Sequence, residues 1–244
     1  MIKVCTDVHG AGEELLAAYY KFCKAEDEIW LLGDLFDRGM AGHLVWSFLQ
    51  QPNHFAIKGN HDLKIEAFLT GKRKWLPDHY LWALKNLNEH GVSNEQILNY
   101  IQKLPILVPK TVNGKDFILV HAGVCLDDPY REDISINIYG NYSGDKRIKV
   151  KIKPVEGREK ANGAQFPEEP YYWWDRYNGK PTVLFGHLVC DNFQPRIRNG
   201  SIGLDGALVH GKNLLMYCLD NNETFVYSSG IDWYGKFKQM RWTP

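Results

Sequence analysis

The sequence contains no long hydrophobic run and no charge excess, and both absences restrict the class of protein. No stretch of about 18 apolar residues occurs, which is the length that a membrane-spanning helix needs. Met1 to Asp7 include no basic leader followed by an apolar segment, so we expect neither secretion nor membrane insertion. The 29 basic and 29 acidic side chains cancel, which argues against a protein that coats a polyanion. Any attraction for phosphate must therefore be local.

The chain has few cysteines, and their spacing shows no paired motif. The chain has five cysteines, an odd number, and no Cys-x-x-Cys pair. A disulfide framework and a closed structural zinc site are therefore not expected. We predict reduced, mostly buried thiols in a cytoplasmic protein. The sequence also lacks internal repeats and low-complexity tracts, and no pattern in it indicates an oligomeric state.

The first half of the chain alternates short apolar runs with helical periodicity. Residues 2–5 and 29–32 are typical of strands, and apolar positions between 15 and 23 recur at helical spacing. The same rhythm predicts a strand at 55–57 and helices near 41–50, 62–70, 79–89 and 94–103. This order is typical of an α/β fold.

After Pro105 the pattern changes to strands with few helices, which gives the second half an α+β character. The expected strands are 116–120, 182–185, 201–204, 213–219 and 224–227. Residues 127–180 have an irregular order of Gly, Pro, aromatic and basic residues. We interpret them as a lid-like insertion in a single domain that spans residues 1–244.

Short polar segments follow five of the expected strands. They are Asp7-Val8-His9-Gly10, Gly33-Asp34-Leu35-Phe36-Asp37-Arg38-Gly39, Gly59-Asn60-His61-Asp62, His121-Ala122-Gly123 and Gly186-His187. Each segment alone is weak evidence, because an isolated Asp-x-His or Gly-His is usually a turn. The carboxyl ends of strands are where α/β proteins place ligands, so five such segments together predict one site.

The residue types in these segments predict a centre with two divalent metal ions. The candidate ligands are Asp7, His9, Asp34, Asn60, His121 and His187. They offer oxygen and nitrogen donors, which suit Mn above all, with Fe, Zn or Ni as possible alternatives. Two carboxylates against two such cations leave a local charge of about +2, which attracts a phosphate dianion despite the neutral chain. We expect Asp34 to bridge the ions.

Three further residues of these segments suit catalysis at phosphorus. Adjacent residues of an extended loop point in different directions, so His61 can face the substrate while Asn60 faces metal. His61 is then the candidate general acid, and Asp37 can orient its imidazole. Arg38 offers a fork of donors to phosphate oxygens.

With these motifs in this order, the chain resembles the calcineurin-like metallophosphoesterases of the phosphoprotein-phosphatase type. It looks most like bacterial bis(5'-nucleosyl)-tetraphosphatases and the phosphatase module of polynucleotide kinase-phosphatase. Closer matches are Phe68-Leu69-Thr70-Gly71, Tyr139-Gly140 with Ser143-Gly144, and Trp174 to Gly179 leading into Val183-Leu184-Phe185-Gly186-His187. Asp205-Gly206-Ala207-Leu208 and Leu188-Val189 depart from the usual Asp-Thr-Gly-Cys and Thr-Pro, which bears on substrate preference.

The resemblance covers nearly the whole chain and implies a two-sheet β-sandwich flanked by helices. It assigns Asp7, His9 and Asp34 to one metal, and Asp34, Asn60, His121 and His187 to the other. It also implies an acid, an orienting carboxylate and a phosphate clamp at the positions of His61, Asp37 and Arg38. Arg131 occupies a place where relatives carry a second phosphate-binding arginine.

Several features outside the motifs have two interpretations. His210 could reach substrate or be an ordinary loop histidine. The alternating residues 147–153 could guide a polyphosphate or nucleic acid, or form a lysine-protected edge strand. The aromatic residues 171–174 could stack on a nucleobase or pack beneath the lid. His43, His54, His79 and His90 are expected to be ordinary surface or helix histidines.

We therefore predict a dinuclear-metal phosphoesterase that hydrolyses phosphate esters or anhydrides by attack of metal-bound hydroxide. The expected substrate is a phosphorylated small molecule or nucleotide, with a dinucleoside polyphosphate first. The alternatives are a Ser/Thr phosphoprotein and the 3'-phosphate of a nucleic-acid end. A non-catalytic scaffold is the remote alternative, because such a relative should have lost metal ligands.

Overall fold

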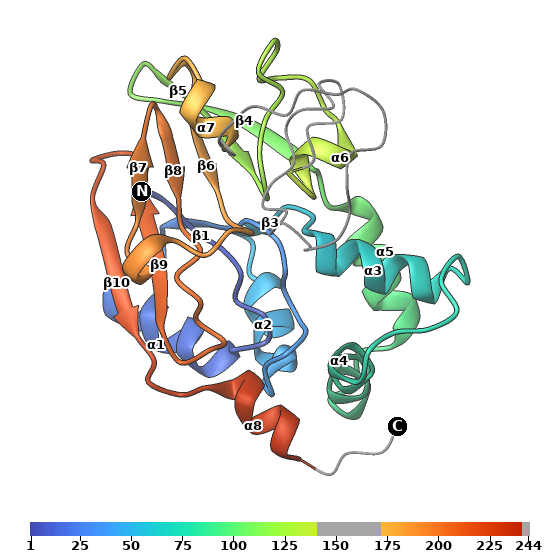
Figure 1. Cartoon of the computed structure of the whole chain (residues 1–244). Helices are drawn as coiled ribbons and strands as arrows, with labels where there is room; N and C mark the ends of the chain where they lie inside the picture. The colour runs from blue at the N-terminus through green and yellow to red at the C-terminus, as the bar shows by residue number, and fades with distance from the viewer. Residues whose placement is uncertain (141–171, 241–244) are drawn as a thin grey trace, which may run out of the picture.

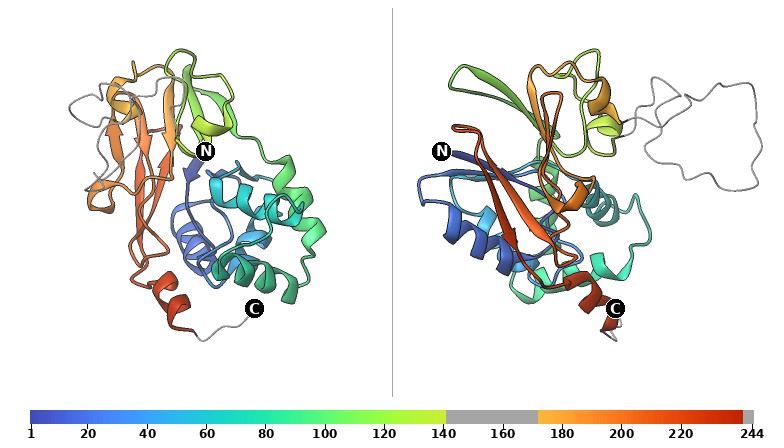
Figure 2. Two further views of the ribbon diagram at one scale, coloured as in Figure 1. Left: turned by 45° about the vertical axis from the view of Figure 1, so that its right-hand side comes forward. Right: turned by 60° about the vertical axis from the view of Figure 1, so that its left-hand side comes forward.

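The computed structural model describes residues 1–140 and 172–240, which form two stacked β-sheets with helices on the outside (Figure 1, Figure 2). In these residues each sheet has five strands. The first has the order β10 (Thr224–Ser228), β9 (Asn213–Cys218), β1 (Ile2–Cys5), β2 (Glu28–Leu31) and β3 (His54–Ala56). The second has the order β4 (Leu107–Val112), β5 (Lys115–Val120), β6 (Thr182–Phe185), β8 (Ser201–Gly203) and β7 (Arg196–Arg198).

Most helices lie on the side of the first sheet. The longer ones are α1 (Gly12–Phe22), α2 (Gly42–Leu49), α3 (Asn60–Leu69), α4 (Asp78–Glu89) and α5 (Asn94–Lys103). The short ones are α6 (Ile134–Asn137), α7 (Trp173–Arg176), the 3-10 turn Asp191–Phe193 and α8 (Trp233–Gln239). In the described part of the chain, no helix is long and apolar enough to cross a membrane.

The alternation of side chains along the strands produces the layers. Cys5 and Leu31 face the helices, whereas Val4 and Leu32 face the second sheet. On the second sheet, Leu119 faces inward, and its neighbours on β5 pack outward against Trp173, Trp174 and Tyr177. This is the two-sided burial expected when successive residues point to opposite faces. The result is a sandwich covered on both outer faces.

The strand directions bring the polar segments together. β1, β2 and β3 are parallel, and β5, β6 and β8 are also parallel. The loops after the two sets meet, because the His187 backbone N–H donates to Asp7 Oδ2 at 2.9 Å and His121 Nδ1 lies 2.7 Å from the Leu32 carbonyl oxygen. The candidate site therefore lies at one edge of the sandwich.

The predicted fold class is confirmed, and each predicted helix and strand in the described residues is present within a few positions. Six elements of the described residues were not predicted: the strands β4 and β7, the short helices α6, α7 and α8, and the 3-10 turn Asp191–Phe193. Residues 147–153 and Tyr171 lie outside the described residues, as does most of the predicted insertion. Trp173 and Trp174 are 1% and 2% exposed, which confirms the packing interpretation for these two rings.

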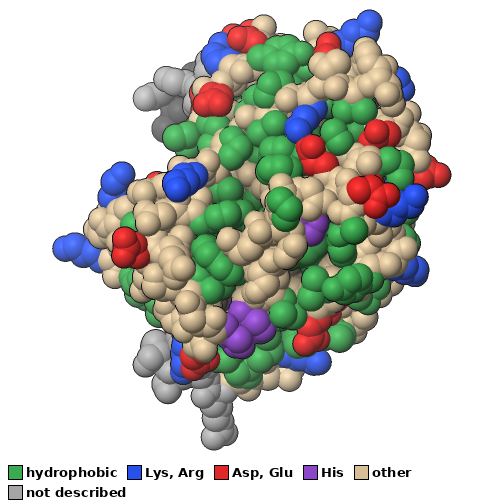
Figure 3. Space-filling model, turned by 180° about the vertical axis from the view of Figure 1, so that it is seen from behind, with side chains coloured by type: hydrophobic (Ala, Val, Ile, Leu, Met, Phe, Trp, Pro, Cys, Tyr) green, Lys and Arg blue, Asp and Glu red, His purple; other side chains and the backbone are tan. Residues whose placement is uncertain are grey.

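The surface agrees with the neutral composition. On the face seen from behind, acidic and basic side chains are scattered among apolar and uncharged atoms (Figure 3). No single-sign field covers this face, so a charged ligand has to be recognised at a local site.

Candidate active site

Tight loops with unusual backbone geometry hold the candidate ligands. Positive φ angles occur at Asp7 (52°), His9 (44°), Asp34 (56°), Arg38 (70°) and His187 (64°). This left-handed region is unfavourable for residues other than Gly, and such strain persists where the surrounding structure fixes it, often at functional sites. The clustering of strain here marks the site independently of the motifs.

Two glycines allow the loops to approach closely. A Cβ atom at Gly59 would lie 2.3 Å from the Asp34 backbone nitrogen and from Asp34 Oδ1. One at Gly186 would lie 2.1 Å from Asp7 Oδ2 and from Thr6 Oγ1. Side chains at either position would displace a carboxylate, which explains why glycine precedes Asn60 and His187 in the motifs.

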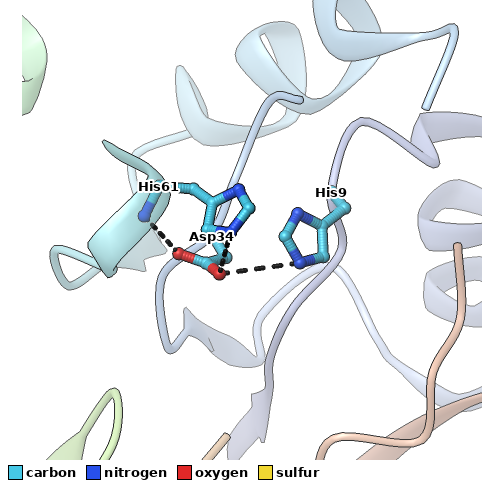
Figure 4. A group of neighbouring side chains, drawn as sticks. All are labelled: His9, Asp34 and His61. Carbon is cyan, nitrogen blue, oxygen red and sulfur yellow. Dashed lines mark hydrogen bonds and ion pairs between the residues drawn. The ribbon is translucent and has the colours of Figure 1, made fainter. Parts of the chain in front are cut away.

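One group of donors lies around Asp34 Oδ2. His9 Nε2 is 3.5 Å from this oxygen and 3.8 Å from Asp7 Oδ1 (Figure 4). Asp7 is fixed through its other oxygen, which accepts hydrogen bonds from Thr6 Oγ1 at 2.6 Å and from the His187 backbone. All three side chains are buried.

The second group lies around Asp34 Oδ1. His121 Nε2 is 3.5 Å from this oxygen and 3.1 Å from Asn60 Oδ1. His187 Nδ1 is 3.2 Å from Asn60 Oδ1. Asp34 thus directs one oxygen towards each group, and the His61 backbone N–H donates to Oδ1 at 2.8 Å. The five other predicted ligands converge on this carboxylate.

The chemistry of the donor atoms fits a cation. The Leu32 carbonyl requires a proton on His121 Nδ1, which leaves a lone pair on Nε2. The Asn60 oxygen faces this lone pair and other acceptors, at Asp34 and His187, while the Asn60 nitrogen faces a lysine donor, Lys64 Nζ. Acceptors facing one another in a buried pocket are unfavourable unless a cation lies between them or the Asn60 amide is turned so that its nitrogen donates. In either orientation, carboxylates and imidazoles are ligands that divalent metal ions accept. The donor set therefore fits a divalent metal ion.

The electrostatics agree with this fit. Burial, followed by the charges of Asp205 and Asp34, raises the pKa of Asp7. Burial lowers the pKa of His9 to about 4 and that of His187 to about 3, which keeps both imidazoles neutral and able to ligate. Clustered carboxylates that repel one another are relieved by a bound cation.

Asp37 connects the two functional histidines. Its Oδ1 is 3.0 Å from His9 Nδ1 and its Oδ2 is 2.7 Å from His61 Nδ1, and the carboxylate is completely buried. Burial opposes ionisation of Asp37, but the neighbouring His61 and His9 outweigh it and hold the pKa well below its usual value. Burial lowers the pKa of His61, and the Asp37 and Asp34 charges outweigh this and raise it. The arrangement favours a charged imidazole.

Arg38 lies over both histidines. Its Nη1 is 3.0 Å from His9 Nε2 and its Nη2 is 3.2 Å from His61 Nε2. These contacts are hydrogen bonds only when both Nε2 atoms are unprotonated, because a guanidinium group can only donate. The side chain is 26% exposed, so it borders the cavity.

The residues open into a cavity of about 140 Å³. His210 and Asp205 lie in its wall together with the apolar side chains Val189, Leu208 and Val209. Burial raises the pKa of Asp205 to about 6. The lining of the cavity therefore combines the ligand atoms with several apolar side chains.

Arg131 is not part of this wall. Its guanidinium forms a bidentate ion pair with Asp127, at 2.7 and 2.9 Å, and the side chain is 48% exposed.

His43 stacks on His90 with ring centroids 3.6 Å apart, and His54 Nδ1 lies 2.7 Å from the Phe48 carbonyl. His43 on α2 and His90 at the end of α4 match the expectation of helix histidines, whereas His54 is buried at the start of β3.

The expectation that His79 lies away from the motifs is wrong. α4 brings His79 Nε2 to 3.5 Å from Asp37 Oδ2 and Tyr80 Oη to 2.9 Å from His61 Nδ1. Asp62 was also overlooked, although it accepts backbone hydrogen bonds from Asp34, Leu35 and Gly59 and so ties two motifs together. The position of Asp62 within the motif Gly-Asn-His-Asp could have indicated its role. Nothing in the sequence indicated that α4 brings His79 and Tyr80 to the site.

The fold and site define a metal-binding phosphoesterase of the two-sheet type. The sequence profile of the calcineurin-like phosphoesterases matches residues 1–191, and the chain belongs to this family. The family resemblance predicted from the motifs is confirmed.

Individual relatives agree. A symmetrical bis(5'-nucleosyl)-tetraphosphatase of Actinobacillus pleuropneumoniae is 33% identical over 122 residues, which cover 48% of this chain and 43% of that protein. The chain thus matches less than half the length of this relative. The asymmetrical bis(5'-nucleosyl)-tetraphosphatase PrpE of Geobacillus sp. is 23% identical, over 94% of this chain and 95% of its own length.

Solved structures show the same fold. One, provisionally assigned as a diadenosine tetraphosphatase, has a TM-score of 0.63 at 19% identity, over 93% of each chain. A protein serine/threonine phosphatase from Saccharomyces cerevisiae has a TM-score of 0.51 at 16% identity, over 94% of this chain and 79% of that one. These likenesses extend over nearly all of the present chain.

Proposed function

We propose that this protein is a metal-dependent hydrolase of phosphate esters or anhydrides, with a dinucleoside polyphosphate as its preferred substrate. The observation that carries the proposal is the convergence of the five other candidate ligands around the two oxygens of Asp34, beside His61, Asp37 and Arg38. A non-catalytic scaffold has no need of this combination, because strained loops and buried charged groups cost stability.

The ligand groups support two divalent ions. Asp7, His9 and Asp34 would hold one, and Asp34, Asn60, His121 and His187 the other. Manganese is the first choice, because the donors are carboxylate, amide oxygen and imidazole without thiolate. When bound, such ions supply Lewis-acid activation of a water nucleophile and of the phosphoryl oxygens.

The chain's own side chains account for the remaining tasks. Arg38 would bind oxygens of the transferred phosphoryl group through its paired Nη donors. His61 would give a proton from Nε2 to the leaving oxygen, while Asp37 holds its Nδ1–H and stabilises the charged ring. To make the phosphate contact, Arg38 has to leave His61 Nε2, which is also the position from which His61 donates.

Two features favour a nucleotide anhydride as substrate. Bis(5'-nucleosyl)-tetraphosphatases are among the relatives, one of them aligned over nearly the full chain. The cavity lining also includes the apolar side chains Val189, Leu208 and Val209 together with the ligand atoms, which suits a substrate with a phosphate chain and a less polar end. We keep the predicted lid at 127–180 and a substrate contact by His210 within this proposal. A second phosphate contact by Arg131 also stays a proposal, and it would require Arg131 to leave its ion pair with Asp127.

A comparison of substrates tests the proposal. The manganese-loaded protein would be assayed on diadenosine tetraphosphate, a phosphoserine/phosphothreonine peptide and a 3'-phosphorylated oligonucleotide, with p-nitrophenyl phosphate as the control. We expect kcat/KM for the dinucleotide to exceed the others by about a hundredfold, equivalent to some 2.7 kcal/mol of transition-state preference.

The other outcomes are distinguishable. If the peptide or the oligonucleotide is preferred, the hydrolytic mechanism stands and the substrate assignment is replaced. Stoichiometric metal binding without turnover of any of the four substrates would instead support the scaffold.

A further inference from the structure

The aromatic ring of Tyr234 lies beside the proposed phosphate clamp. The Arg38 Cζ atom is 5.6 Å from the Tyr234 ring centroid, within the range of a cation–π contact. Lys238 Nζ lies 4.1 Å from the same centroid, so two cations meet this ring at the border of the cavity. Tyr234 belongs to α8, which lies far from all five motifs in the sequence.

α8 is fixed to the body of the protein by polar contacts. Trp233 Nε1 donates to the buried carboxylate of Glu14 on α1, which also accepts from Ser229 Oγ at 3.1 Å. The Tyr234 backbone N–H donates to the Val209 carbonyl at 3.1 Å, and Asp232 caps the helix by accepting from the Gly235 N–H at 2.8 Å. The ring is therefore presented from a defined backbone position.

The contacts of Arg38 with the two histidines do not hold it when the site is loaded. Its Nη1 occupies the His9 Nε2 lone pair, which the proposed metal ion needs. A single lone pair serves one partner, so a bound ion would displace Arg38 from His9. The Arg38 Nε has no hydrogen-bond partner within the described residues, and its distance to Asp37 Oδ2 is 3.8 Å. The His61 contact is given up as well when Arg38 turns to the phosphate, so the Tyr234 ring and the 3.8 Å ion pair with Asp37 are the contacts of Arg38 that remain.

We infer that Tyr234 is a positioning residue for Arg38. It holds the guanidinium group at the cavity, ready to bind the phosphate, once metal occupies the site. The inference rests on the proposed function only in taking Arg38 as the phosphate-binding residue. The interaction uses the ring face and not the hydroxyl group, so phenylalanine at this position should preserve it.

Phosphate binding tests the inference without requiring turnover. Isothermal titration calorimetry with inorganic phosphate would compare the manganese-loaded protein with its Tyr234→Leu and Tyr234→Phe variants. We expect Tyr234→Leu to weaken binding about three- to tenfold, in keeping with a partly exposed cation–π contact, and Tyr234→Phe to bind within twofold of the parent. Equal weakening in both variants would overturn the role of the ring.

A double-mutant cycle separates positioning from general damage. In an Arg38→Ala background, Tyr234→Leu should have no further effect on phosphate affinity, because it acts through Arg38. Phe237→Leu is the matched control in α8, since Phe237 is buried and its ring packs near those of His79 and Trp82. It should lower thermal stability and leave phosphate affinity unchanged. If Phe237→Leu weakened phosphate binding as much as Tyr234→Leu, the effect would belong to helix docking and the inference would be wrong.

These measurements remain informative if the proposed activity fails. Loss of turnover on every substrate, with phosphate binding that depends on Arg38 and Tyr234, would refute the proposed function and leave the positioning role intact. Phosphate binding that is insensitive to Arg38→Ala would refute the inference itself.

Discussion

Replacement of Asp37 by asparagine should damage metal binding and proton transfer together. Asp37 accepts from His9 Nδ1 through one oxygen and from His61 Nδ1 through the other, at 3.0 and 2.7 Å. Asparagine retains one acceptor oxygen and turns the other position into a donor. One imidazole must then accept at Nδ1 and carry its proton on Nε2. If that ring is His9, its Nε2 can no longer ligate a cation; if it is His61, the ring is neutral, has lost the carboxylate that stabilised its charge and is a weaker acid.

The magnitude follows from the bond that is lost. A hydrogen bond to a charged group contributes about 1.5 to 3 kcal/mol, which corresponds to a loss of about 10- to 150-fold in kcat. The assay would measure kcat on p-nitrophenyl phosphate together with bound manganese. Asp116→Asn, the same change on an exposed residue of β5, is the control and should behave as the parent protein. An Asp37→Asn protein that retains two metal ions and a kcat within threefold of the parent would refute this account of the site.

The remaining predictions concern the acid, the bridge and the stability of the fold. His61→Ala should retain its metal and lose activity mainly on an alkyl phosphate, whose leaving group needs a proton; equal activity of variant and parent on that ester would remove His61 as the acid. Asp34→Asn should lose manganese, measured by elemental analysis, and nearly all turnover. Burial raises the pKa of Asp27, but hydrogen bonds from Lys3 at 2.6 Å, the Lys24 amide and the amino terminus outweigh it and lower the value to about 2. Because this pKa is depressed, the Asp27 contribution to stability is complete above about pH 4 and is lost as the pH falls towards 2; urea unfolding of Asp27→Asn should show a smaller loss between these pH values than the parent.

Local sequence was sufficient for most of the elements and for the motifs of the proposed site. Apolar alternation on β1, β2 and β5 reflects burial on both faces, and this signal is contained within a few residues of sequence. The motifs give residue types and their position after strands, so they predict a common edge. The missed elements have a physical reason as well: β7 has only three residues, and its central Ile197 is 65% exposed, so it carries no pattern of burial.

Local sequence did not predict how the helices pack against the site. His79 and Tyr80 look like ordinary residues of an amphipathic helix, and only the packing of α4 against the site brings them to Asp37 and His61. Tyr234 is similar, since nothing near it in the sequence resembles a motif and its approach to Arg38 depends on the anchoring of α8 through Glu14. Arg131 shows the opposite case: its position suggested a role at the cavity, and the structure pairs it with Asp127.

The sequence by itself thus determined the family, the layered α/β class and the nine residues of the proposed metal and phosphate chemistry, because these depend on short-range periodicity and on motifs read in order. The tertiary structure alone decided which atoms face one another: the two oxygens of Asp34 towards two sets of donors, Asp37 between two imidazoles, and Tyr234 beside Arg38. These relations join residues that are distant in the chain, and their distances are set by packing between layers, which no local pattern encodes.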